Sequence, residues 1–169
     1  SSTAPTSISS TQTSLSQIIG ATLTHPPIIC LALVFACYAS QWTSVTSFLP
    51  SLYVENGLSL KMTGLLVSLV VVANLGGTFG AGMLLQKGWT TQMLLTIGFV
   101  GMFVTSILTF TTNSWLPFEI QFLNAVLFSM IGGVIPTTII SMTLHYAPFT
   151  SAAAASMGLV IQCSALVQF

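Results

Sequence analysis

Charged side chains are nearly missing from this sequence. Two Lys and two Glu are the whole charged set of the 169 residues, or 2% of the chain, whereas soluble domains carry about 25% charged residues. They are Glu55, Lys61, Lys87 and Glu119. A water-soluble fold could not cover its surface with so few charges, and two lysines cannot build a nucleic-acid-binding patch or a polybasic membrane-surface patch. Nucleic acid is therefore excluded as a partner.

Patterns typical of catalysis and metal binding are also missing. Cys30, Cys37 and Cys163 lie in apolar stretches without CxxC spacing, and His25 and His145 have no metal-ligand partner at a useful spacing. No Gly-rich phosphate loop or nucleophile elbow occurs. We therefore predict no metal, no cofactor and no enzymatic activity, and we expect the cysteines to be small buried apolar residues.

Apolar residues make up 53% of the chain. They form five runs, each near the length of about 20 residues that a helix needs to cross a hydrocarbon core of about 30 Å. The runs cover residues 28–52, 62–85, 91–111, 115–142 and 152–169. They are apolar on all sides and lack the period-two alternation of a barrel strand, so they favour helices. The sequence predicts an all-α membrane protein, a bundle of about five transmembrane helices.

The first 24 residues differ from the rest. Ser and Thr dominate up to Gln17, and a short semi-apolar stretch then leads to His25, Pro26 and Pro27. Prolines are tolerated in the first turn of a helix. We predict a linker with a short pre-helix over residues 1–24 and a membrane domain over 25–169. Lys61 and Lys87 fall in successive loops, so charge does not give the orientation.

Polar side chains inside the apolar runs are candidate substrate contacts, because a polar group in lipid needs a partner, a cavity or a ligand. Gln41 and Ser44 share one face of the first run. The predicted substrate-binding residues are Gln41, Trp42, Ser44, Asn74, Gln121 and Asn124. Glu119 has two interpretations: a carboxylate at a helix start, where the helix dipole favours it, or a group that couples transport to a proton or cation.

Glycines mark expected contacts between helices. Gly76 and Gly80 form a small-xxx-small pair that lets another backbone approach closely. Gly132 and Gly133 precede Pro136, whose ring removes a helical hydrogen bond, so a kink is expected in the fourth run. Both a packing role and a role in movement are open for this kink.

The segment from Ser16 to about Leu95 combines several features. A polar linker precedes a helix that carries Gln41 and Trp42, and a Gly-rich helix returns and ends in residues 82–88, Gly-Met-Leu-Leu-Gln-Lys-Gly. This succession resembles the start of the second half of a major facilitator superfamily transporter, and residues 82–88 are similar to the family's Gly-x-Leu-Ala-Asp-Arg-x-Gly loop. Gln86 replaces the acid and Lys87 the arginine of that signature.

This resemblance implies that the five runs correspond to helices seven to eleven of a twelve-helix carrier in the plasma (inner) membrane. The chain would then be a piece of a longer protein, and its partners would be the lipid bilayer, a small-molecule substrate and the missing N-terminal half. The loops at Asn56 and Asn113 would lie outside the cytoplasm, and those at Lys87 and Pro148 inside. Substrate would lie between the two halves near the midplane.

Two functions remain open from the sequence. The first is transport of a small solute by alternating access, as part of a secondary carrier. The second is a non-transporting multi-span membrane subunit or anchor, in which the amides hold helices together. The second function predicts that Gln41, Asn74 and Gln162 pair with each other and line no cavity.

Overall fold

The computed structural model describes residues 15–111, 117–148 and 150–168. Every regular element among them is helical. The elements are α1 (Leu15–Leu23), α2 (Pro26–Glu55), α3 (Leu60–Gln86), α4 (Thr91–Thr111), α5 (Phe118–Gly132), α6 (Val134–Tyr146), the 3-10 turn η1 (Thr150–Ala152) and α7 (Ala153–Leu166). The prediction of an all-α membrane bundle is confirmed. Of the linker and pre-helix predicted for residues 1–24, residues 1–14 lie outside the described residues, and so does the turn predicted around Asn113.

Among the described residues, four stretches are long and apolar enough to cross a membrane: α2, α3, residues 91–109 of α4, and α5 with α6 together. The α5–α6 span covers Phe118–Tyr146 in 29 residues. The fifth predicted run forms α7, which has 14 residues and is therefore shorter than the roughly 20 residues of a full span. The first membrane span, α2, begins at Pro26 and ends at Glu55, so it is longer at both ends than the predicted run over residues 28–52.

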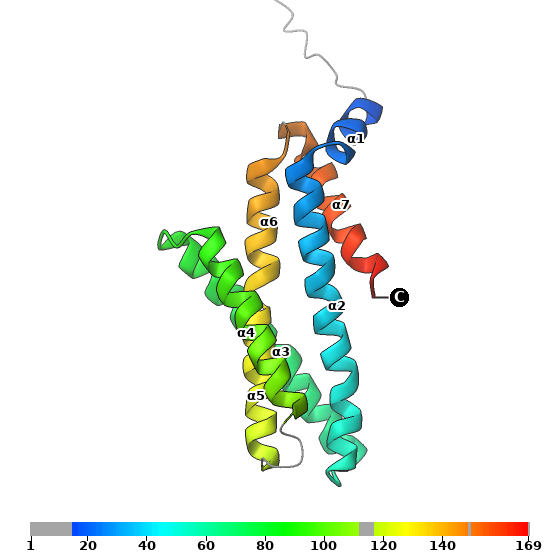
Figure 1. The fold of residues 1–169 in the computed structure, drawn as a ribbon, viewed down its shortest axis with the longest axis vertical. Helices are drawn as coiled ribbons and strands as arrows, with labels where there is room; N and C mark the ends of the chain where they lie inside the picture. Colours follow the sequence, from blue (N-terminus) through cyan, green and yellow to red (C-terminus); the bar gives the residue numbers. More distant parts are fainter. Residues whose placement is uncertain (1–14, 112–116, 149, 169) are drawn as a thin grey trace, which may run out of the picture.

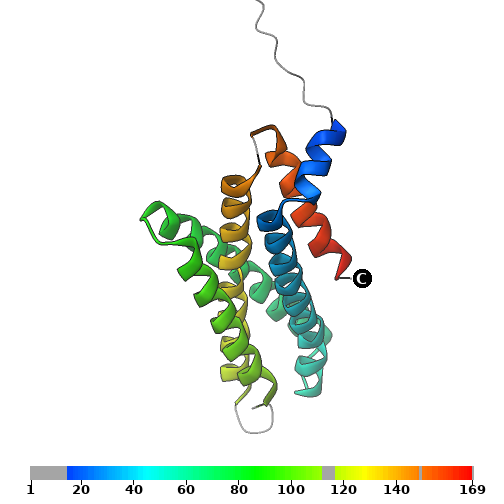
Figure 2. The ribbon, with the colours of Figure 1, turned by 45° about the horizontal axis from the view of Figure 1, so that its top comes forward.

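The α5–α6 span lies at the centre of the bundle (Figure 1). α3 and α4 both pack mainly against α5 and make few contacts with each other, while α2 packs mainly against α7. The C-terminal ends of α2 and α4 lie at one end of the bundle, and those of α3 and α6 lie at the other (Figures 1 and 2). Successive spans are therefore antiparallel.

Two buried clusters hold the spans together. The larger one joins α2, α4, α5, α6 and α7 and includes Tyr38, Met102, Phe128 and Val160. The smaller one joins α2, α3 and α5 around Tyr53, whose ring meets that of Phe118 edge-on at 5.2 Å between centroids. Such edge-to-face pairs add to the stabilisation from burial.

The expected burial is wrong for Cys30 and Cys37, while Cys163 packs against the larger cluster. Cys30 and Cys37 are exposed on α2, and Cys163 is half-buried. The burial preference of cysteine is a property of proteins in water, where an apolar side chain avoids the solvent. Lipid is itself apolar, so a helix face turned towards it can carry a thiol at little cost.

The interruption expected near Pro136 lies at Gly133, between α5 and α6. Gly133 has φ −61° and ψ −18°, which a helix tolerates, and its N–H still donates to the Ser129 carbonyl at 3.0 Å. Pro136 has no N–H to offer the carbonyl of Gly132. α5 therefore ends and α6 begins at a glycine three residues before the proline, and the two helices continue as one span.

The expected close packing at Gly76 and Gly80 is not found, because a Cβ at either position would meet nothing within 4 Å. The close approach is at Gly77 instead, where a Cβ would overlap the carbonyl oxygen of Met130. On the opposite helix, a Cβ at Gly133 would overlap the carbonyl oxygen of Asn74. The backbones of α3 and the α5–α6 span thus touch directly at two glycines, one from each helix.

Candidate functional site on α2

Two of the predicted substrate contacts hold helices together. The Asn74 side chain on α3 donates to the Ser129 carbonyl of α5 at 2.9 Å. The Asn124 side chain on α5 donates to the Thr105 carbonyl at 2.7 Å and to the Thr109 hydroxyl at 2.6 Å, both on α4. Each amide therefore ties α5 to a neighbouring helix.

Hydroxyl groups extend this contact past the helix break. Thr78 of α3 donates to the Gly133 carbonyl at 3.2 Å, and Thr137 of α6 donates to the Thr78 carbonyl at 3.3 Å. These bonds and that of Asn74 flank the close approach at Gly77 and Gly133. Both threonine bonds hold α3 against the junction of α5 and α6.

Replacing Asn124 with Ala should destabilise the protein by about 1 kcal/mol, because interhelical hydrogen bonds in membranes contribute roughly this much. The matched control is Gln162→Ala, since Gln162 is exposed on α7 and should leave stability unchanged. Unfolding by sodium dodecyl sulfate in mixed micelles measures both. Equal stability of the two variants would show that the Asn124 bonds contribute nothing.

Trp42 packs into the core. Its Cδ1 lies 3.6 Å from the position that a Cβ on Gly132 would take, and the ring lies against the larger buried cluster. The indole Nε1 is buried and has no hydrogen-bond partner in the part of the chain that the structure describes. Gly132 therefore leaves room for the indole ring between α2 and α5, while the role of Trp42 towards a substrate stays a prediction.

Gln121 and Glu119 lie close together in the chain and differ in burial. Gln121 is buried in α5, with 5% of its surface exposed. Glu119 is exposed and lies in the first turn of α5, where the positive end of the helix dipole favours a carboxylate. That position agrees with the helix-start interpretation, and a coupling role of Glu119 stays a prediction.

Gln41 and Ser44 lie on a polar part of the α2 surface. Gln41 is half-buried and Ser44 is exposed, and the Ser44 hydroxyl donates to the Ser40 carbonyl of its own helix at 2.8 Å. Three further serines are exposed at matching intervals. The stripe, called the serine face below, consists of Ser40, Ser44, Ser47 and Ser51. The spacing of four, three and four residues places all of them on one side of the helix.

The serine face also carries the exposed ring of Phe48, but it is more polar than the other outward faces of the bundle. On α3 the exposed side chains include Leu65, Val72 and Phe79, and on α4 they include Val100 and Phe103. Such faces suit lipid tails. A row of hydroxyls beside a half-buried amide suits water, a polar solute or another protein segment better than lipid. Of the four serines only Ser44 was predicted from the sequence, although the spacing of the other three was visible there.

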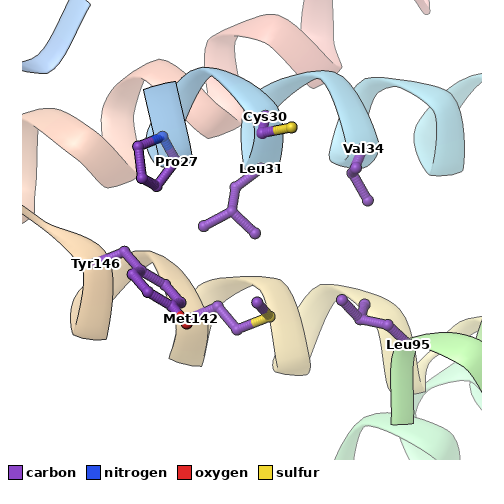
Figure 3. Close-up of a pocket in the computed structure, with 7 residues that line it drawn as sticks. All are labelled: Pro27, Cys30, Leu31, Val34, Leu95, Met142 and Tyr146. Carbon is purple, nitrogen blue, oxygen red and sulfur yellow. The ribbon is translucent and has the colours of Figure 1, made fainter. Parts of the chain in front are cut away.

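A groove lies between α2 and α6 near the start of α2 (Figure 3). Its volume is about 290 Å³. It is lined by Pro27, Cys30, Leu31, Val34, Leu95, Met142 and Tyr146. In Figure 3 the side chains of α2 and α6 face each other across it, with Leu95 of α4 at one end. Because the walls are almost wholly apolar, the groove is suited to an apolar occupant.

No protein family model, curated protein or solved structure matches this chain. Within the described ranges, no group of three or more His, Cys, Asp or Glu side chains is placed to hold a metal ion. Function must therefore be inferred from the polar contacts, the serine face and the packing of the helices.

Proposed function

We propose that this chain is part of a secondary carrier that moves a small solute across the plasma (inner) membrane by alternating access, with α2 lining the solute path. The observation that carries the proposal is the serine face beside Gln41. Its amide and hydroxyls would recognise a neutral or weakly polar part of the solute by hydrogen bonding. A charged group on the solute would need a partner from elsewhere in the carrier, and the chain itself would not act as an enzyme.

The packing of the spans supports a carrier built from inverted repeats. α2 pairs with α7, and α3 pairs with α5, while α2 and the α5–α6 span run in opposite directions (Figure 1). If α2, α3 and α4 form one three-helix repeat, the α5–α6 span and α7 begin the second. In that case α2 corresponds to the α5–α6 span, and α3 corresponds to α7. The contact between α2 and α7 then corresponds to the contact between α5 and α3. A pseudo-two-fold axis in the membrane plane produces this reciprocity, and it is typical of transporters.

The same correspondence between the repeats predicts where one further helix would pack. α4 packs along α5, so the equivalent third helix of the second repeat would pack along α2. The apolar groove at Cys30 and Val34 (Figure 3) offers such a helix a seat on α2. We propose that this helix and an N-terminal half of the same carrier complete the protein.

The second candidate is a non-transporting membrane subunit. Its support is that Asn74 and Asn124 are both used in bonds between helices. This function, however, predicts that Asn74 pairs with Gln41 or Gln162. That prediction is wrong for Asn74, which bonds Ser129 of α5. The side-chain amides of Gln41 and Gln162 make no hydrogen bond to the described residues. Gln41 thus remains available for a ligand, which favours transport.

Cysteine labelling separates the two functions. In the full-length protein without its native cysteines, Ser44→Cys and Ser47→Cys should react with a membrane-impermeant maleimide, because a solute path admits water. Val72→Cys and Phe79→Cys, on the exposed apolar face of α3, are the matched controls and should stay unlabelled. If the serine positions are as unreactive as the α3 positions, the serine face does not line a path and the subunit function is favoured.

A further inference from the structure

α1 is too short to cross a membrane, yet it has an apolar exposed side. Its nine residues give a length of about 14 Å. On one side Thr22 is almost fully buried, since α1 packs against α7 and η1. On the next side around the helix, Ile19 and Leu23 have 50% and 53% of their surfaces exposed. These two residues are four apart and therefore share a face.

We propose that α1 lies in the interface of the bilayer, with Ile19 and Leu23 inserted among the lipid acyl chains beside α7. The position of α1 in the fold indicates that the bilayer covers the exposed face of Ile19 and Leu23. The apolar span of α2 begins at Pro26, directly after α1, so the membrane surface must pass close to α1. Figures 1 and 2 both show α1 at the end of the bundle, above α7.

The apolar surface continues from α7 onto α1. A shallow groove of about 120 Å³ joins the two helices. It is lined by Ile19, Thr22, Leu23, Ala155 and Leu159. A lipid tail beside α7 can therefore extend along Ile19 and Leu23.

The two threonines near the C-terminal end of α1 are also compatible with this position. Thr22 of α1 donates to the Ile18 carbonyl at 2.9 Å, and Thr24, directly after α1, donates to the Gly20 carbonyl at 2.9 Å. These groups are satisfied within the helix itself. The sequence of α1, LSQIIGATL, carries no charge. Its insertion therefore depends on apolar area and not on attraction to anionic lipid, unlike the basic interfacial helices.

Insertion of α1 into the bilayer interface would affect the position of α2, because the two helices are joined by hydrogen bonds. The His25 N–H donates to the Thr22 carbonyl at 3.3 Å, and the His25 carbonyl accepts from Ile28 at 3.1 Å. These bonds connect the end of α1 directly to the first turn of α2. The depth of Ile19 and Leu23 in the bilayer would thus set the level at which α2 enters it. This inference does not depend on the proposed transport function.

Collision accessibility of nitroxide labels tests the proposal. The full-length protein without native cysteines is labelled at Ile19→Cys, Leu23→Cys or Gly20→Cys and placed in phosphatidylcholine vesicles. Gly20 is the matched control, because it is adjacent to Ile19, is exposed, and a Cβ there would meet nothing within 4 Å. We expect oxygen collisions, relative to those of a water-soluble nickel chelate, to be several-fold more frequent at positions 19 and 23 than at 20.

Added phosphatidylserine and added salt should leave these ratios unchanged, since α1 has no charge. Three results would overturn the proposal. Equal access of the nickel chelate to all three labels would place α1 in water. Low access of both reagents at Ile19 and Leu23 would show that protein covers this face. A strong dependence on anionic lipid would show that another segment, and not the apolar face, attaches this end.

Discussion

Replacing Gly77 with Ala should destabilise the bundle by about 3 kcal/mol, the upper part of the range for overpacking in a tightly packed interior. The added methyl would overlap the carbonyl oxygen of Met130. A side chain could rotate away from it, but a backbone carbonyl cannot, so α3 must move away from α5. That movement would also lengthen the bonds of Asn74 and Thr78 to the α5–α6 span.

The adjacent glycine is the control. At Gly76 a Cβ would meet nothing within 4 Å, and alanine favours the helix over glycine by about 1 kcal/mol. Gly76→Ala should therefore be neutral or stabilising. Unfolding of both variants by sodium dodecyl sulfate in mixed micelles gives the comparison. If the two alanines have the same effect, the close approach of α3 and α5 is not a feature of the folded protein.

This pair of glycines also shows how far the sequence could predict the packing. The length and apolar character of the runs predicted the helical spans, because those quantities depend on the bilayer alone. The pattern around Gly76, Gly77 and Gly80 could not show which glycine meets the neighbouring helix. Adjacent residues point about 100° apart around a helix axis. Which glycine contacts the neighbouring helix therefore depends on how α3 crosses α5.

The polar residues had a similar limit. Asn74 and Gln41 are both amides within apolar runs, and the cost of a polar group in lipid flags them equally. The tertiary fold alone gives Asn74 a carbonyl partner on α5 and gives Gln41 none among the described residues. The serine face was overlooked for a related reason. A serine can bond its own helix, as Ser44 does with Ser40, so single serines are a weak signal.

Ser44→Trp in the full-length carrier should lower solute uptake by at least about tenfold, which corresponds to a loss of about 1.4 kcal/mol or more in transition-state stabilisation. Ser44 is exposed near the middle of the serine face, and an indole there would occupy the space through which the solute passes. Uptake of labelled solute into vesicles at matched protein levels measures the effect. The steric control is Val72→Trp, because Val72 is exposed on α3 among other apolar side chains and should tolerate an aromatic ring.

Two smaller substitutions separate blockage from recognition. Ser44→Ala should retain most uptake, since the Ser44 hydroxyl donates its proton to its own helix and can offer the solute only an acceptor oxygen. Gln41→Ala should lower uptake more than Ser44→Ala, because the half-buried Gln41 amide makes no hydrogen bond to the described residues and can bind the solute. Normal uptake by both Ser44→Trp and Gln41→Ala would mean that the solute path lies elsewhere, and α2 would then face another protein segment through its serines.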